Sequence, residues 1–178
     1  MKLDGTAYFR TVANAPMNRA TFQRGYTIEA FVKFPADFVA WGGILSRAGR
    51  GADAGKTGDD PNEPIATFSV TDGHGLQWAV FPLNQNRIST NWGHEMPLDR
   101  WWHVAVVNDG RASTLYVDGS KLLRNPSTPA VGIPAVDDVW FVGAYTYDRK
   151  IDKVFRGLIG DVRVVDRPLD VPRFMLAR

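Results

Sequence analysis

Apolar and polar side chains alternate with a period of two along most of the chain, which predicts β-strands. In residues 26–34 the apolar positions share one strand face, and residues 76–81 alternate in the same way around Trp78. Residues 101–109 are almost continuously apolar, which indicates a strand that is buried on both sides. The same reasoning places further strands in 113–123, 139–143 and 158–166.

Turn signals separate these apolar runs. Asp118-Gly119 stands between two short strand patterns and predicts a two-residue hairpin turn. Helical patterns are scarce, with a turn or two expected in residues 13–22 and another in 169–176. Since no internal repeat or linker is visible, the pattern predicts one all-β domain over residues 1–178, a two-sheet antiparallel sandwich.

The inward positions of these strands predict the core. Either Trp101 or Trp102 should be largely buried, because neighbouring residues of a strand point to opposite faces. The other expected core side chains are Ile28, Val32, Val104, Val106, Leu115 and Val117.

Composition excludes several classes of function. The net charge of +2 and the scattered basic residues give no reason to expect a nucleic-acid partner. The absence of cysteine excludes disulfides and thiolate chemistry. No apolar run is long enough to span a membrane, so no membrane partner is expected. The chain opens "MKLDGTAYFR", which resembles a strand and not a signal peptide, so any targeting signal is expected upstream, in a larger protein.

The stretch "RAGRGADAGKTGDD" ends in a pattern that resembles a phosphate-binding loop. Arg50 stands where that motif needs its first glycine, and helix-breaking residues follow, so nucleotide binding is not expected. Residues 47–64 are instead predicted to form a long surface loop, more mobile than the strands beside it. The acidic residues of this loop are Asp53, Asp59, Asp60 and Glu63. They could surround a calcium ion or simply be solvated at the surface.

Candidate ligand-binding residues come from aromatic side chains in polar surroundings. Trp92, with Asn91 and His94 beside it, lies in a segment that looks rich in turns, and Tyr145 and Tyr147 share a strand face. Such aromatics could stack on sugar rings while neighbouring amides bind the hydroxyls. The alternative is a tryptophan that caps the edge of the core.

Catalytic and zinc-binding patterns are absent from the sequence. The three histidines have no zinc-ligand spacing, and His103, inside an apolar run, is expected to be a structural histidine with a hydrogen-bond partner. Paired carboxylates on one strand face, as a retaining glycosidase needs, do not occur.

Four segments in order resemble the laminin-G-like, concanavalin A-like jelly-roll family: "LDGTAY", "YTIEAFVKF", "WWHVAVVNDGRASTLYVDGS" and "FRGLIGDVRVVDRPL". The resemblance implies two packed antiparallel sheets of about six or seven strands each. It also implies a mostly non-catalytic domain of a larger secreted or surface protein, which binds carbohydrate or a protein partner. Some members hold calcium, and the opening and closing motifs make Asp4 and Asp161 the candidate ligands. Asp161 could equally pair with Arg163.

A narrower resemblance comes from "WAVFP", "TNWGHEMPLDRWWHVAVVNDG" and the final "FM". They are similar to laminin-G-like domains attached to actinobacterial calcineurin-like metallophosphoesterases, which would make this chain an accessory domain. The segment "GAYTYDRK" has tyrosines where pentraxins carry calcium-binding acids, and the carboxylate triplet of glucanases is missing. Three hypotheses follow: a binding domain, a glycan hydrolase or lyase of the same fold, or a structural domain that packs on a neighbouring catalytic domain.

Overall fold

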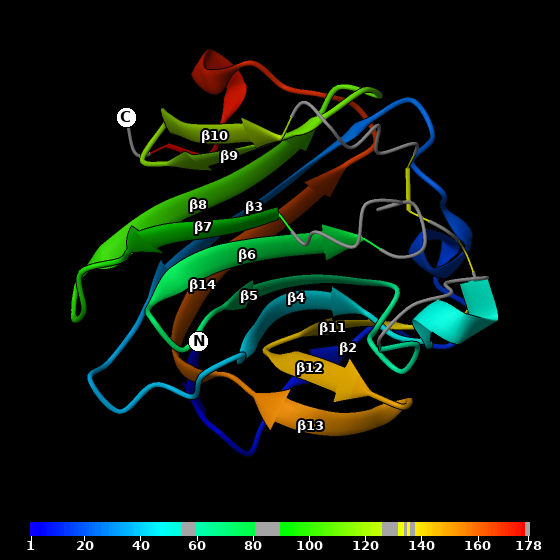
Figure 1. Cartoon of the computed structure of the whole chain (residues 1–178), viewed down its shortest axis with the longest axis horizontal. Coiled ribbons are helices and arrows are strands. Elements are labelled where there is room, and N and C mark those ends of the chain that lie inside the picture. The colour runs from blue at the N-terminus through cyan, green and yellow to red at the C-terminus, as the bar shows by residue number, and fades with distance from the viewer. Residues whose placement is uncertain (55–59, 81–89, 126–131, 134, 136–137, 177–178) are drawn as a thin grey trace.

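The computed structural model describes residues 1–54, 60–80, 90–125, 132–133, 135 and 138–176, and in this part of the chain two six-stranded antiparallel sheets face each other (Figure 1). The first sheet has, in spatial order, the strands β1 (Lys2–Asp4), β14 (Arg156–Val165), β3 (Tyr26–Lys33), β8 (Trp101–Asn108), β9 (Ser113–Val117) and β10 (Ser120–Asn125). The second has β2 (Phe9–Arg10), β11 (Trp140–Val142), β4 (Gly43–Arg47), β5 (Ala66–Val70), β6 (Gly75–Val80) and β7 (Thr90–Glu95).

A two-stranded hairpin accompanies the sheets, and the described residues also form three short 3-10 helices, two between strands and one after the last strand. The hairpin consists of β12 (Ala144–Tyr147) and β13 (Lys150–Val154). The 3-10 helices are η1 (Pro16–Arg19), η2 (Gly51–Ala54) and η3 (Val171–Arg173). The expected all-β sandwich is therefore confirmed, and η1 and η3 occupy the two segments in which helical turns were predicted. None of the described helices has the length and apolar character that a membrane crossing requires.

Alternation along the strands explains the core. The inward residues of β3 and β8 meet those of β5 and β6, and the Trp78 indole N–H donates to the Tyr26 hydroxyl at 2.9 Å across the two sheets. All the predicted core side chains are buried. Trp102 points inward and is 9% exposed, whereas Trp101 points outward and is 46% exposed. The pattern thus predicted the core from its period of two.

The predicted hairpin turn at Asp118-Gly119 is confirmed. Ser120 pairs with Val117, which leaves only two residues in the turn. Both turn residues have positive φ, 47° at Asp118 and 75° at Gly119. Asp and Gly are among the residues that tolerate this backbone region, and they are the preferred pair in such turns.

The loop prediction needs one correction at its start. Arg47 belongs to β4 and is fully buried, because its guanidinium donates to the carbonyls of Ala20 and Asn18 and packs on the Trp140 ring. Ala48 is buried too. A charged residue was assigned to solvent in the prediction, but its charge is satisfied by carbonyls from a distant segment.

A polar network lies on the outer face of the first sheet, under the C-terminal segment. The buried Glu29 carboxylate binds the Nε2 of His103 at 2.9 Å, the guanidinium of Arg163, and the backbone N–H of Met175 at 2.8 Å. His103 is therefore a buried histidine with a hydrogen-bond partner, as expected. Arg163 pairs with Glu29 and not with Asp161, because the neighbouring strand β3 places Glu29 directly opposite it.

Candidate functional site

The β12–β13 hairpin packs on the outer face of the second sheet, over β4 (Figure 1). The Ser46 hydroxyl donates to the carbonyl of Ala144 at 2.8 Å. A Cβ at Gly43 would overlap the same carbonyl, so glycine is required there for the hairpin to approach. The hairpin thus forms a local third layer and positions Tyr145 and Tyr147.

Both tyrosines of the hairpin bind the segment that leads into β5. The Tyr145 hydroxyl donates to Glu63, and the Tyr147 hydroxyl donates to Asp60 at 3.1 Å. Tyr145 is only 8% exposed, and burial raises the pKa of its hydroxyl. Tyr147 is 37% exposed. Tyr145 therefore fixes the segment to the hairpin, and Tyr147 leaves part of its ring at the surface.

An ion-pair cluster joins the same loop to the turn of the hairpin. Asp53, in η2, binds Arg50 at 3.1 Å and Arg149 at 2.7 Å, and Arg50 also reaches Asp148 at 3.3 Å. The hydrogen bonds from Arg50 and then Arg149 hold the pKa of Asp53 well below its usual range.

Three of the four loop acids are thus bound by side chains of this chain: Asp53, Asp60 and Glu63. Their partners in the hairpin are more than 80 residues away in sequence, and no local pattern could reveal them. Asp59 and the "GKT" tripeptide lie outside the described residues, and the mobility of the loop stays a prediction.

Asn91, Trp92 and His94 lie in the strand β7, at the edge of the second sheet. The sequence pattern had predicted a turn-rich segment there, and that prediction is wrong. The strand forms because its backbone pairs with β6, where Gln77 stands opposite Asn91. The side chains of these three residues are outside the described part of the structure. Whether they share a site with the tyrosines therefore stays a prediction.

The outer face of β4, β5 and β6 carries small polar side chains that the sequence analysis did not single out. Ser46 stands opposite Thr67, and Ser69 stands opposite Gln77. The hydroxyls of Thr67 and Ser69 are buried and have no hydrogen-bond partner among the described residues. These side chains are covered and closed to solvent, so they form a buried polar layer and not an open binding surface. The alternation of Thr67, Phe68 and Ser69 in β5 was the available signal.

The two candidate calcium ligands do not share a site. Asp4 lies opposite Arg156 in β14, and Asp161 lies five residues further along that strand. At about 3.3 Å per residue this separation is roughly 16 Å, whereas calcium needs its oxygen ligands within about 2.6 Å. The Asp4 carboxylate accepts hydrogen bonds from the hydroxyl and the N–H of Thr6, which lower its pKa. Among the described residues, no three His, Cys, Asp or Glu side chains gather as a metal site would require.

Comparison with known proteins identifies a family and several similar structures. A family model described as the concanavalin A-like lectin/glucanases superfamily matches residues 3–173. Domain 4 of AbnA, an extracellular arabinanase from Geobacillus stearothermophilus in complex with arabinotriose, is 19% identical, with a TM-score of 0.63 over 97% of this chain and 72% of that one. No curated protein sequence matches the chain.

Two further structures share the architecture. The CBM40 of the Ruminococcus gnavus IT-sialidase, bound to α2,3 sialyllactose, is 15% identical, with a TM-score of 0.70 over 97% of this chain and 92% of that one. A heptameric SAP-like pentraxin from Limulus polyphemus is 18% identical, with a TM-score of 0.61 over 96% of this chain and 76% of that one. At such low identities these likenesses establish the fold, and they confirm the jelly-roll prediction.

Proposed function

Because the chain belongs to the concanavalin A-like lectin/glucanase superfamily, we propose that it is a non-catalytic carbohydrate-binding domain of a larger protein. The observation that carries this proposal is the match, over 97% of the chain, to two domains whose structures hold oligosaccharides. A secreted or cell-surface location is part of the proposal, and it is supported by the extracellular enzyme that contains one of these domains.

The proposed site lies at the surface of the β12–β13 hairpin and along β7, at the edge of the second sheet. Tyr147 offers a half-exposed ring, and the Asp60 carboxylate beside its hydroxyl can accept hydrogen bonds from sugar hydroxyls. Trp92, Asn91 and His94 are proposed to extend this surface along β7, because aromatic rings and amides together suit sugar recognition. Tyr145 is assigned to hold the site together through Glu63.

A panel of oligosaccharides tests this proposal. Isothermal titration of the purified chain should detect binding of at least one of arabinotriose, α2,3 sialyllactose or a β-glucan trimer. Replacement Tyr147→Ala should weaken that binding about tenfold, the loss expected when one aromatic contact of roughly 1–1.5 kcal/mol is removed. Phe9→Ala is the control, because Phe9 is 54% exposed on β2 at the opposite edge of the sheet from β7. Absence of binding across the panel would contradict the proposal.

The identity of the parent protein is a finer proposal. The proposal that the neighbouring domain is a metallophosphoesterase rests on the sequence resemblance alone. Two alternatives to carbohydrate binding are that the chain binds a protein partner or that it only packs against that neighbouring domain. A glycan hydrolase or lyase of the same fold is the enzymatic alternative. Sugar release from the same panel by the purified chain, abolished by a single Asp or Glu replacement, would favour that enzyme over a binding domain.

Calcium also stays a proposal from the resemblance. A ligand that binds only the native state raises stability, so bound calcium predicts a higher melting temperature in excess calcium than in chelator. Equal melting temperatures would contradict it. The structure limits the form of any such site, since Asp4 and Asp161 are too far apart to hold one ion together.

A further inference from the structure

A second polar surface lies on the outer face of the first sheet, away from the site proposed above. One continuous row of paired residues crosses four neighbouring strands: Lys2 on β1, Leu158 on β14, Lys33 on β3 and Trp101 on β8. An open pocket of about 470 Å³ covers the β1–β14–β3 part of this row, and Pro35 and Asp37 are also among its lining residues. Trp101 adjoins the pocket, because paired Cα atoms on neighbouring strands are about 5 Å apart.

The charges of the pocket favour an anion. Three cations line it, Lys2, Lys33 and Arg156, together with two carboxylates. Asp37 is paired with Arg156 at 3.2 Å, and Asp4 accepts the two hydrogen bonds of Thr6. Within the described part of the chain, no ion pair involves Lys2 or Lys33. The pocket lining therefore carries a net charge of +1, from three cations and two carboxylates, and neither ammonium group beside Leu158 is held in an ion pair with a described residue.

Trp101 supplies a flat apolar surface beside these charges. Its indole extends from β8 across β3, since a Cβ placed on Gly160 of β14 would lie 3.6 Å from a ring carbon and 3.0 Å from the Cβ of Phe31. The ring therefore lies along the sheet and reaches Gly160 of β14. With Trp101 46% exposed, one face of the indole is open to solvent.

We infer that this surface, the Trp101 groove (Lys2, Lys33, Arg156, Leu158 and Trp101), binds an acidic saccharide. A sugar ring stacks on the indole of Trp101, and the carboxylate of that sugar lies against the ammonium of Lys33. The ammonium of Lys2 is then available to the carboxylate of the next sugar unit of the saccharide. The inference rests on the proposed function, because it assigns a sugar to an aromatic platform. The ammonium groups of Lys2 and Lys33 favour a carboxylated sugar over a neutral one, since an ion pair with a carboxylate is stronger than a neutral hydrogen bond.

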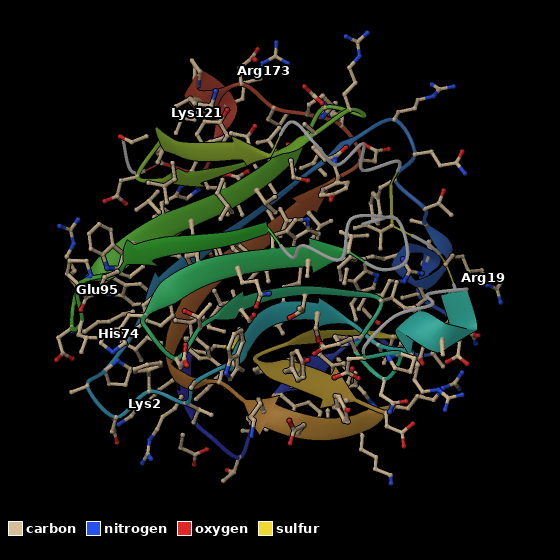
Figure 2. All side chains as sticks on the ribbon, in the orientation of Figure 1. Lys2, Arg19, His74, Glu95, Lys121 and Arg173 are labelled. Carbon is tan, nitrogen blue, oxygen red and sulfur yellow. The ribbon has the colours of Figure 1, made fainter. Side chains whose placement is uncertain are left out.

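The experiment uses two matched probes, a galacturonic acid trimer and a neutral galactose trimer, in isothermal titrations of the whole chain. The acidic trimer should bind at least tenfold more tightly than the neutral one, and its affinity should fall as salt is added. Trp101→Ala and Lys33→Gln should each weaken binding of the acidic trimer about tenfold. Lys121→Gln is the control, because Lys121 is an exposed lysine at the other end of the molecule from Lys2 (Figure 2).

The outcomes separate the two proposals. If oligosaccharides bind but the trimers bind equally, or if Trp101→Ala and Lys33→Gln leave the affinity unchanged, the groove is not the site and the proposed function stands. If no oligosaccharide of either panel binds, both proposals fail. Melting curves confirm that each variant is folded, and Lys2→Gln, at an exposed position of the edge strand, provides a second variant should Trp101→Ala fail to fold.

Discussion

At the scale of single residues, two adjacent tryptophans show how strand alternation separates structure from surface. Trp102 packs in the core, and its indole N–H donates to the carbonyl of Pro97 at 2.8 Å. Trp102→Ala should lower the free energy of unfolding by about 3–5 kcal/mol, because it removes a large apolar contact and leaves a cavity. Trp101→Ala, on the outer face, should change it by less than about 1 kcal/mol. Urea denaturation measures both, and equal losses would show that the faces are misassigned.

Tyr145 and Tyr147 form a second matched pair. Tyr145→Phe removes a nearly buried hydrogen bond to a carboxylate, which should cost about 1.5–3 kcal/mol of unfolding free energy. Tyr147→Phe removes a similar bond at the surface, where water replaces it, and should cost less than about 0.5 kcal/mol. Thermal and urea unfolding of the two variants should therefore differ clearly. A larger loss for Tyr147→Phe would contradict the assignment of Tyr145 as the structural member of the pair.

Sequence could predict the residues of the core but not their polar partners. The period of two identified Ile28, Val32 and Trp102 as inward residues, because alternation is a local property of the chain. The burial of Arg47 and the pairing of Glu63 with Tyr145 depend on segments 27 and 82 residues away. Such contacts follow from topology, so the chemical type of a residue alone gives no indication of them.

At the scale of elements, the β12–β13 hairpin depends on contacts from the loop that precedes β5. A two-stranded hairpin is marginally stable by itself. Here Asp53 binds Arg149 at the hairpin turn, where Asp148 and Arg149 both have positive φ. Asp53→Asn should therefore increase amide hydrogen exchange in residues 144–154 and leave the protection of β8 unchanged.

Asp152→Asn is the control for this experiment, since Asp152 pairs only weakly with its neighbour Lys153 at 3.8 Å. The global melting temperature should hardly change in either variant, because exposed ion pairs contribute little to stability. Faster exchange throughout the sheets after Asp53→Asn would show that the loop supports the whole fold and not the hairpin alone.

The strand elements were largely predictable, and their assembly into a site was not. Apolar runs identified β3, β6, β8 and β14, because each needs a buried face. The strand β7 was interpreted as a turn-rich segment, since polar residues and Gly93 conceal a strand whose main support is backbone pairing with β6. The Trp101 groove was missed because it combines β1, β14, β3 and β8, which are adjacent only after folding.

At the scale of the whole molecule, the C-terminal segment closes the outer face of the first sheet through the Glu29 network. Phe174 packs against His103 and Tyr116, while Arg163 links Glu29 to the carbonyl of Arg173. Burial raises the pKa of Glu29, but the hydrogen bonds from His103, the Met175 amide and Arg163 outweigh burial and lower it overall.

This lowered pKa makes the stability of the protein depend on acid in a defined direction. A carboxylate whose pKa is lower in the folded than in the unfolded state stabilises the fold at pH values above its pKa in the unfolded state, ordinarily about 4.5. That contribution to stability is lost as the pH falls through the pKa of the carboxylate in the folded state. Glu29→Gln should thus cost about 2 kcal/mol or more at pH 7, and the difference from the unmodified protein should shrink below about pH 4.5.

Urea unfolding at a series of pH values between 3 and 8 measures this effect. Asp161→Asn is the matched control, because it removes an exposed carboxylate on the same sheet, in β14, and should leave the acid dependence as it is. A constant difference between Glu29→Gln and the unmodified protein across the whole range would contradict the role given to this carboxylate. Exchange of the Met175 amide offers an independent check, since that amide donates to Glu29 and should lose protection in the same variant.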